Sequence, residues 1–187
     1  MKITHLYTAK GGQGCTVTAA LFALVQPGRT LIVDDAPVPD MPAVLGLQIP
    51  QDWEDGGVTA QVSPTVDLVR YQVTSTWAAD YDNVVYDHGR DEPPDYHGDE
   101  RWYMVIRPCY LAIRHAICHD HRPDGIIVVR EPARALTETD IEATLSTPIV
   151  ATIDIDPSVA RMVDAGLMAS RYDRRKLRIL NDTLQGR

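Results

Sequence analysis

The chain has 187 residues, of which 44% are hydrophobic, and it carries a formal net charge of −8. This length and composition favour one domain with a sizeable core over two domains. The negative charge argues against a protein that coats nucleic acid with its whole surface, because phosphate contacts need clustered Lys and Arg. The three cysteines have no paired spacing, and no stretch resembles a signal peptide or a membrane span. We therefore expect a cytoplasmic protein with no transmembrane segment.

A glycine-rich segment follows the apolar run Ile3–Tyr7 and precedes the apolar run Val17–Val25. Glycines let successive backbone N–H groups point inward at an anion, and a helix that begins near Thr16 adds the positive end of its dipole. This order of strand, loop and helix predicts a phosphate-binding loop, although a tight turn can use glycines for positive φ alone. The position before Thr16, where such a loop normally has a Lys, holds Cys15. The segment reads Ala9-Lys10-Gly11-Gly12-Gln13-Gly14-Cys15-Thr16.

Short apolar runs rich in Val and Ile alternate with helical stretches along the rest of the chain. Buried strands are predicted at Ile3–Tyr7, Thr30–Val33, Val66–Val69, Val84–Tyr86, Tyr103–Ile106, Gly125–Val129 and Ile149–Ile153. Helices are predicted at Thr16–Val25, Tyr110–Cys118, Glu138–Leu145 and Ser158–Ala169. The alternation predicts an α/β fold with a mostly parallel sheet covered by helices on both faces. Two segments without such patterns, Pro37–Pro64 and Arg90–Arg101, are expected to be surface loops.

Three blocks of the chain resemble the ParA/MinD family of P-loop ATPases, and they occur in the family's order. The glycine-rich segment is similar to the family's deviant Walker A loop, KGGxGKT. Tyr81–Asp87 is similar to the strand YDxVIID, and Ile153–Arg161, followed by Gly166, is similar to the segment IPxDxxV, which lies beside the adenine in the family. The resemblance implies a P-loop NTPase-like three-layer sandwich over residues 1–171 and a short basic extension over 172–187.

The resemblance also implies ATP and Mg²⁺ as ligands and a homodimer as the assembly. Lys10 would cross the dimer interface to the partner's phosphates, and the alternative is an exposed loop Lys without a partner. The hydroxyl of Thr16 would bind Mg²⁺ together with Asp34 and Asp87, and the alternative for Thr16 is an ordinary helix N-cap. Catalytic roles fall to Lys10 and Asp87. The implied cofactor-binding residues are Gly11, Gly12, Gln13, Gly14, Cys15, Thr16 and Asp156.

The chain departs from the family at three functional positions. Cys15 replaces the Lys that neutralises the β- and γ-phosphates, which removes a charge-assisted contact. Ala36 stands where the family has the acid that orients the attacking water, and Asp35 or Asp40 could replace it. Arg130 stands where the family presents an Asn to the base. A similar loss of the loop Lys occurs in the TadZ/CpaE-like branch, whose switch region the segment around Asp40 also resembles.

These residues leave three functional interpretations open. The preferred one is a ParA/MinD-like nucleotide switch in DNA partition or intracellular positioning, with a partner protein and with weak or absent hydrolysis. The second is a pseudo-ATPase scaffold that binds partners without nucleotide. The third is an active ATPase that uses Asp35 or Asp40.

Three weaker patterns have simpler interpretations beside the functional ones. His115, Cys118 and His119 do not have a recognised zinc spacing, so surface His and buried Cys are favoured. Cys15 as a catalytic thiolate lacks a recognisable His partner. The basic tail from Arg171 to Leu180 could contact DNA phosphates or anionic lipid, whereas a helix packed on the domain with its charges in water is favoured.

Overall fold

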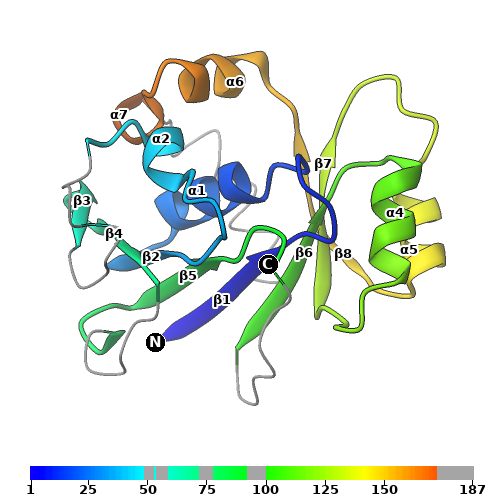
Figure 1. Ribbon diagram of the computed structural model, residues 1–187, viewed down its shortest axis with the longest axis horizontal. Coiled ribbons are helices and arrows are strands. Elements are labelled where there is room, and N and C mark those ends of the chain that lie inside the picture. Colours follow the sequence, from blue (N-terminus) through cyan, green and yellow to red (C-terminus); the bar gives the residue numbers. More distant parts are fainter. Residues whose placement is uncertain (49–52, 54–58, 72–77, 92–99, 172–187) are drawn as a thin grey trace.

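The computed structural model describes residues 1–48, 53, 59–71, 78–91 and 100–171. Its centre is an eight-stranded sheet with the strand order β3-β4-β2-β5-β1-β6-β7-β8 (Figure 1). All neighbouring strands run parallel except β3 and β4, which pair in the antiparallel direction. The strands are β1 Lys2–Tyr7, β2 Thr30–Asp34, β3 Ala60–Ser63, β4 Val66–Arg70, β5 Asn83–Asp87, β6 Arg101–Ile106, β7 Gly125–Arg130 and β8 Ile149–Asp154.

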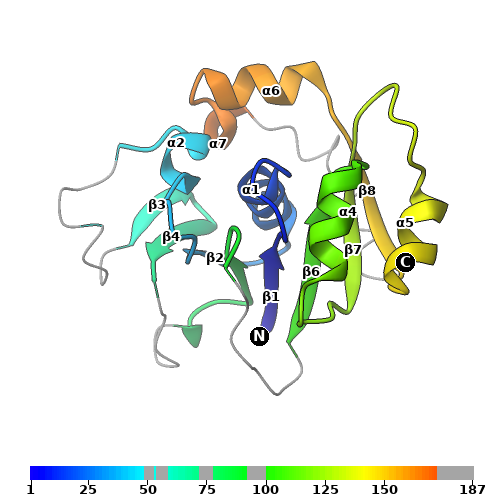
Figure 2. The same ribbon diagram turned by 45° about the vertical axis from the view of Figure 1, so that its right-hand side comes forward.

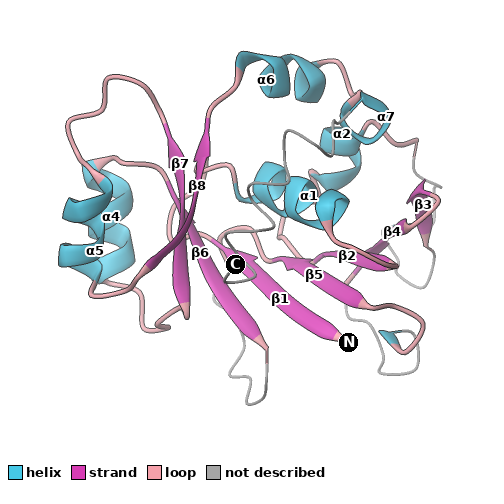
Figure 3. Cartoon of the chain, turned by 180° about the vertical axis from the view of Figure 1, so that it is seen from behind, coloured by secondary structure: helices cyan, strands magenta, loops and turns pink. Residues whose placement is uncertain are grey.

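Helices cover both faces of the sheet, as Figures 1 and 3 show from opposite sides. Helix α1 packs on one face, against residues such as Ile32 of β2 and Val85 of β5. Helices α4 and α5 pack on the other face, over β6 and β7. Figure 2 shows α6 and α7 above α1, with α2 beside them. The helices are α1 Cys15–Val25, α2 Met41–Leu45, α4 Tyr110–Ile117, α5 Glu138–Leu145, α6 Pro157–Asp164 and α7 Met168–Arg171.

The predicted α/β sandwich is confirmed, and every predicted strand is present. The central strands read as continuous apolar runs because both of their faces are covered. Strand β2 is buried over its whole length. Within the described residues, no helix is long and apolar enough to cross a lipid bilayer.

Several details differ from the sequence-based expectations. Cys118, which was expected to be buried, is exposed at the end of α4. The expected loop Pro37–Pro64 contains the helix α2 and the edge strand β3. Both elements have five residues or fewer, which is too short for a periodic hydrophobic signal. The expected helix Ser158–Ala169 is divided into α6 and α7 by a turn at Gly166, which has φ 61°. Residues 92–99 of the second expected loop and the basic tail 172–187 lie outside the described residues.

The sheet topology brings the predicted site residues to one edge. In parallel strands the carboxyl ends lie at the same edge, and ligands of open α/β sheets bind there. Strand β1 lies between β5 and β6, so the loop that leaves β1 is flanked by the loops that leave β5 and β6. The loop that leaves β2 is one strand further along this edge.

Candidate functional site

The glycine-rich segment forms the connection between β1 and α1, as predicted. Gly12 and Gly14 have φ values of 76° and 88°, and Gly14 is the N-cap residue of α1. This left-handed backbone favours glycine, because other residues pay a steric cost for their Cβ there. The loop therefore presents backbone N–H groups at a helix N-terminus, which is the arrangement that binds phosphate.

Hydrogen bonds fix this loop to its neighbours. The N–H of Thr8 donates to the carbonyl of Gly89 at 2.8 Å. The side chain of Gln13 is 3% exposed, and its Oε1 accepts from the N–H of Arg107 at 2.9 Å. The amide of Gln13 thus joins the loop to the end of β6. This structural contact was not expected from the sequence.

Cys15 begins α1 and is buried beside Asp87. Burial raises the pKa of the Cys15 thiol well above its usual value, and the negative charge of Asp87 raises it further. The thiol is therefore neutral at pH 7. A catalytic thiolate requires the opposite shift, so this environment argues against Cys15 as a nucleophile.

Asp34 and Asp87 are opposite each other in the pairing of β2 with β5, and both side chains are fully buried. Burial and the charge of Asp87 raise the pKa of Asp34 to about 7, although Arg70 opposes this shift. Burial also raises the pKa of Asp87, against the lowering effect of the Thr16 hydroxyl and the Cys15 thiol. Nη1 of Arg70 lies 3.5 Å from Oδ1 of Asp34, so this buried cation offsets part of the repulsion between the two carboxylates.

The residues at this edge suit Mg²⁺ bound together with a phosphate. Oδ1 of Asp87 accepts from the N–H of Gly89 at 3.1 Å, whereas its buried Oδ2 has no hydrogen-bond partner among the described residues. Within those residues, no group of three or more His, Cys, Asp or Glu side chains is arranged to hold a metal ion. Mg²⁺ commonly takes only one or two carboxylates and completes its shell with phosphate and water. The pair Asp34 and Asp87, with the Thr16 hydroxyl, fits that pattern.

Asp87→Asn is expected to stabilise the ligand-free protein at pH 8 by about 1–2 kcal/mol, because it removes one of two buried like charges. At pH 5 the difference should nearly vanish. The raised pKa of Asp34 means that the native state keeps a proton which the unfolded chain releases above about pH 4. Its contribution to stability is therefore complete below that pH and is lost as the pH rises through about 7. Thermal unfolding at both pH values would measure the change.

The matched control for this prediction is Asp82→Asn. Asp82 lies directly before β5, at the opposite edge of the sheet, and accepts from the N–H of Arg29 at 2.8 Å. Its substitution should leave the pH dependence of unfolding unchanged. An Asp87→Asn protein that unfolds at a lower temperature than the wild type at pH 8 would contradict the like-charge explanation.

Strand alternation separates Asp34 from Asp35. Successive side chains of a strand point to opposite faces of the sheet. Oδ2 of Asp35 bonds to Nδ1 of His88 at 3.0 Å, and Nε2 of His88 bonds to Nδ1 of His5 at 2.9 Å, on the face away from α1. This position does not favour Asp35 as the replacement for the missing acid. Asp40 is the exposed N-cap residue of α2.

Ala36 lies where the resemblance requires the second acid. The Cβ of Ala36 is 2.9 Å from the position that a Cβ of residue 89 would occupy, two residues beyond Asp87. Its N–H donates to Oδ1 of Asp34 at 3.4 Å. An alanine methyl group cannot accept a proton or orient water, so the described part of this site lacks that function at position 36.

Thr16 and Lys10 both lie within the site. Thr16 is the second residue of α1, so the expected alternative role as N-cap falls to Gly14 instead. The hydroxyl of Thr16 interacts with Asp87. Nζ of Lys10 donates to the carbonyl of Gly11 at 3.2 Å.

A cavity of about 610 Å³ brings the glycine-rich loop together with the predicted adenine segment. Gly14 and Val17 line one side, and Ile155 and Asp156 line another. The carboxylate of Asp156 also caps α6 by accepting from the N–H of Ser158 at 2.7 Å. The cavity is mostly apolar and has a volume typical of small-molecule sites.

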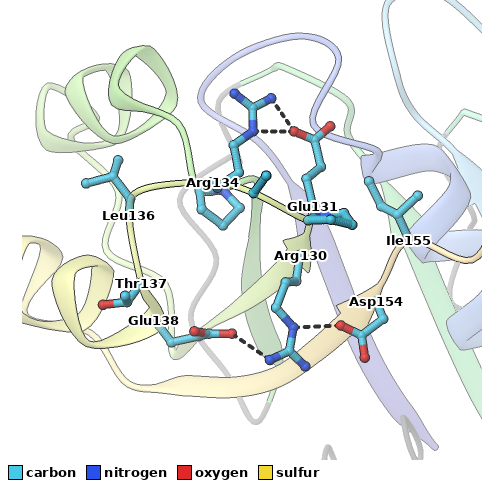
Figure 4. Close-up of a pocket in the computed structure, with 11 residues that line it drawn as sticks. Arg130, Glu131, Arg134, Leu136, Thr137, Glu138, Asp154 and Ile155 are labelled. Atoms are coloured by element: carbon cyan, nitrogen blue, oxygen red, sulfur yellow. Dashed lines mark hydrogen bonds and ion pairs between the residues drawn. The ribbon is translucent and has the colours of Figure 1, made fainter.

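Arg130 lines a second, neighbouring cavity of about 430 Å³ (Figure 4). Its Nε bonds to Oδ1 of Asp154 at 2.6 Å, and its Nη1 lies 3.4 Å from Oε1 of Glu138. Arg130 is thus held by two carboxylates of the protein. Figure 4 also shows Arg134 paired with Glu131 on the other side of this cavity.

The sequence patterns did not predict three arginines that lie at this site. Arg70 is 3% exposed, and its Nη1 donates to the carbonyls of Asp34 and Ala36, at 2.7 Å each. Arg90 and Arg107 lie on either side of the glycine-rich loop. Their positions in the sequence could have indicated two of them. Arg70 and Arg107 stand at the ends of predicted strands, as Asp34 and Asp87 do.

No protein-family model matches the sequence, and no curated protein matches it significantly. Solved structures do match its fold. A ParA family ATPase from Chlorobium tepidum TLS superposes with a TM-score of 0.74 and 20% identity, over 98% of this chain and 97% of that one. MinD in the MinC:MinD cell division complex of Aquifex aeolicus gives a TM-score of 0.71 and 17% identity, over 100% and 95%.

A third match is an ATP complex of a McdA variant from Cyanothece, with a TM-score of 0.62 and 13% identity, over 100% of this chain and 94% of that one. The resemblance found in the three sequence blocks and the arrangement of the whole sheet point to the same group of proteins. The chain has the fold of the ParA/MinD ATPases, a P-loop NTPase-like α/β sandwich.

Proposed function

We propose that this protein is a ParA/MinD-like nucleotide switch that acts in DNA partition or intracellular positioning. The observation that carries the proposal is one continuous site: a left-handed glycine loop at a helix N-terminus, a buried carboxylate pair beside it, and an adjoining cavity of about 610 Å³. A phosphate, a cation and a base would each find a matching environment there.

The chain's own residues have distinct parts in this switch. The N–H groups of Gly12 to Thr16 orient the phosphates, and the Thr16 hydroxyl with Asp34 and Asp87 holds the metal. When bound, MgATP supplies a γ-phosphate whose presence or loss distinguishes two states of a switch protein. Hydrolysis is weak or absent, because Ala36 offers no group to orient water and Cys15 offers no charge to the phosphates.

We also propose a homodimer and a partner protein. Lys10 keeps the position that, in the resemblance, reaches the phosphates of the second subunit. The MinD structure of Aquifex aeolicus is a complex with MinC, which supports a protein partner for a chain of this fold. DNA contact through the basic tail stays a prediction, because the tail lies outside the described residues.

Calorimetry with MgATP tests the switch directly. We expect saturable binding whose affinity increases from pH 6 to pH 8. The pKa of Asp34 is raised to about 7, so below that pH the group is protonated and cannot act as a metal ligand. Binding should also release protons, which makes the measured heat depend on the buffer. The absence of heat and of a thermal shift at millimolar nucleotide would overturn the switch.

A pseudo-ATPase scaffold is the second candidate. Two observations favour it: the neutral, buried thiol of Cys15 occupies the lysine position, and Arg130 is paired with Asp154 and Glu138. A scaffold would bind its partner equally well with and without MgATP. The switch requires that the nucleotide change this affinity, so a pull-down with the partner in both conditions separates the two functions.

A further inference from the structure

The glycine-rich loop lacks its internal cation, yet two arginine side chains from other strands flank it. Cδ of Arg90 lies 3.1 Å, and Nε lies 3.7 Å, from the position that a Cβ of residue 11 would occupy. On the other side, Nη2 of Arg107 lies 3.9 Å from the corresponding position at Gly14. Each of these two half-buried glycines therefore has a guanidinium-bearing side chain beside it.

The backbone around Arg90 is held in place by the loop itself. Arg90 follows Asp87 by three residues, in the turn that leaves β5. The carbonyl of Gly89 accepts from the N–H of Thr8 at 2.8 Å, and the N–H of Gly89 donates to Oδ1 of Asp87 at 3.1 Å. These two hydrogen bonds join the segment that carries Arg90 to the start of the phosphate loop and to the carboxylate pair.

The two arginines differ in whether their guanidinium groups are paired with a carboxylate of the protein. Nη1 of Arg107 bonds to Oε1 of Glu131 at 2.8 Å, and its backbone N–H donates to Gln13. Arg90 forms no ion pair and no side-chain hydrogen bond with any residue that the structure describes. Lys10, the cation of the loop itself, directs its Nζ to the carbonyl of Gly11. Of these three cations, Arg90 is the one whose side chain has no polar partner among the residues that the structure describes.

We propose that Arg90 replaces the missing loop lysine as the cation that contacts the polyphosphate of a bound nucleoside di- or triphosphate. Its planar guanidinium suits two phosphate oxygens at once, and it is always charged at neutral pH. Arg107 holds the opposite side of the loop through Gln13 and contributes a second, partly neutralised charge. The inference rests on the proposed function, because it needs a nucleotide in this site.

The test measures MgATP affinity by calorimetry for the wild type, R90Q and R90K. A lost charge-assisted contact should weaken binding by about 10–100-fold in R90Q, whereas R90K, which keeps the charge and loses the planar two-point contact, should have an affinity between those of R90Q and the wild type. R101Q is the matched control. Arg101 is an exposed residue at the amino end of β6, 3.9 Å from Asp124, at the edge of the sheet away from the loop. The R101Q protein should bind MgATP with the same affinity as the wild type.

The double variant Cys15→Lys with Arg90→Gln tests whether the two positions supply the same phosphate-binding charge. If they do, Arg90→Gln weakens MgATP binding less in the Cys15→Lys background than in the wild type. Affinity in R90Q equal to the wild type, or an equal loss in the two backgrounds, would overturn the role of Arg90 and leave the switch standing. A wild type that binds no MgATP would overturn the switch and this role together.

Discussion

Cys15→Lys is expected to increase the affinity for MgATP by about 10–100-fold, because it adds a charge-assisted phosphate contact to a loop whose backbone already has the required shape. Residue 15 begins α1 and stands beside Asp87, so the added ammonium group also neutralises part of the buried carboxylate pair. Calorimetry with MgATP at pH 8 gives the change in affinity.

Cys15→Met is the control for this prediction. Methionine resembles lysine in length but has no charge, so a gain that appears in both variants would come from packing and not from electrostatics. A Cys15→Lys protein that folds and gains no affinity would contradict an intact phosphate site and favour the scaffold. ATP turnover should stay low in Cys15→Lys, because Ala36 still offers no acid.

Gly46→Ala is expected to lower the free energy of unfolding by about 3 kcal/mol or more. Gly46 ends α2 with φ 75°, and a Cβ there would lie 1.7 Å from the carbonyl oxygen of Gly166. The contact joins the segment after β2 to the turn between α6 and α7, and backbone atoms cannot move aside as a flexible side chain can. Chemical denaturation with urea would measure the loss.

Gly12→Ala isolates the backbone contribution to this effect. Gly12 has nearly the same φ, 76°, but a Cβ there meets no atom of the described residues within 4 Å. Its cost should be only the left-handed strain of about 1–2 kcal/mol. Equal losses in the two variants would show that the approach of Gly46 to Gly166 contributes nothing.

Local sequence patterns were sufficient to predict the architecture and the glycine-rich loop of the site. The continuous apolar strands predicted a covered parallel sheet, because only such strands are buried on both faces. The glycines predicted the loop, and its place after β1 needed no tertiary information. Asp34 and Asp87 were predicted from the resemblance to the ParA/MinD family, and the parallel pairing of β2 with β5 brings them together at one edge of the sheet.

The sequence patterns could not predict short elements or contacts between residues that are far apart in the chain. Helix α2 and strand β3 are too short to show a period, and their places depend on packing against longer elements. Whether Asp35 could replace the acid missing at Ala36 depended on the register of β2, since one residue of shift exchanges the two faces of a strand. The His88 contact of Asp35 became visible only in the folded chain.

The sequence by itself determined that a glycine-rich loop follows the first strand of an α/β sandwich and that Cys15 stands directly before Thr16. These properties depend on residues adjacent in the chain. Only the tertiary structure decided which cations approach that loop. Arg90 and Arg107 are 79 and 93 residues beyond Gly11 and Gly14, and they meet the loop because β5 and β6 lie on either side of β1. Strand order, which no local pattern encodes, brings their side chains to the glycine-rich loop.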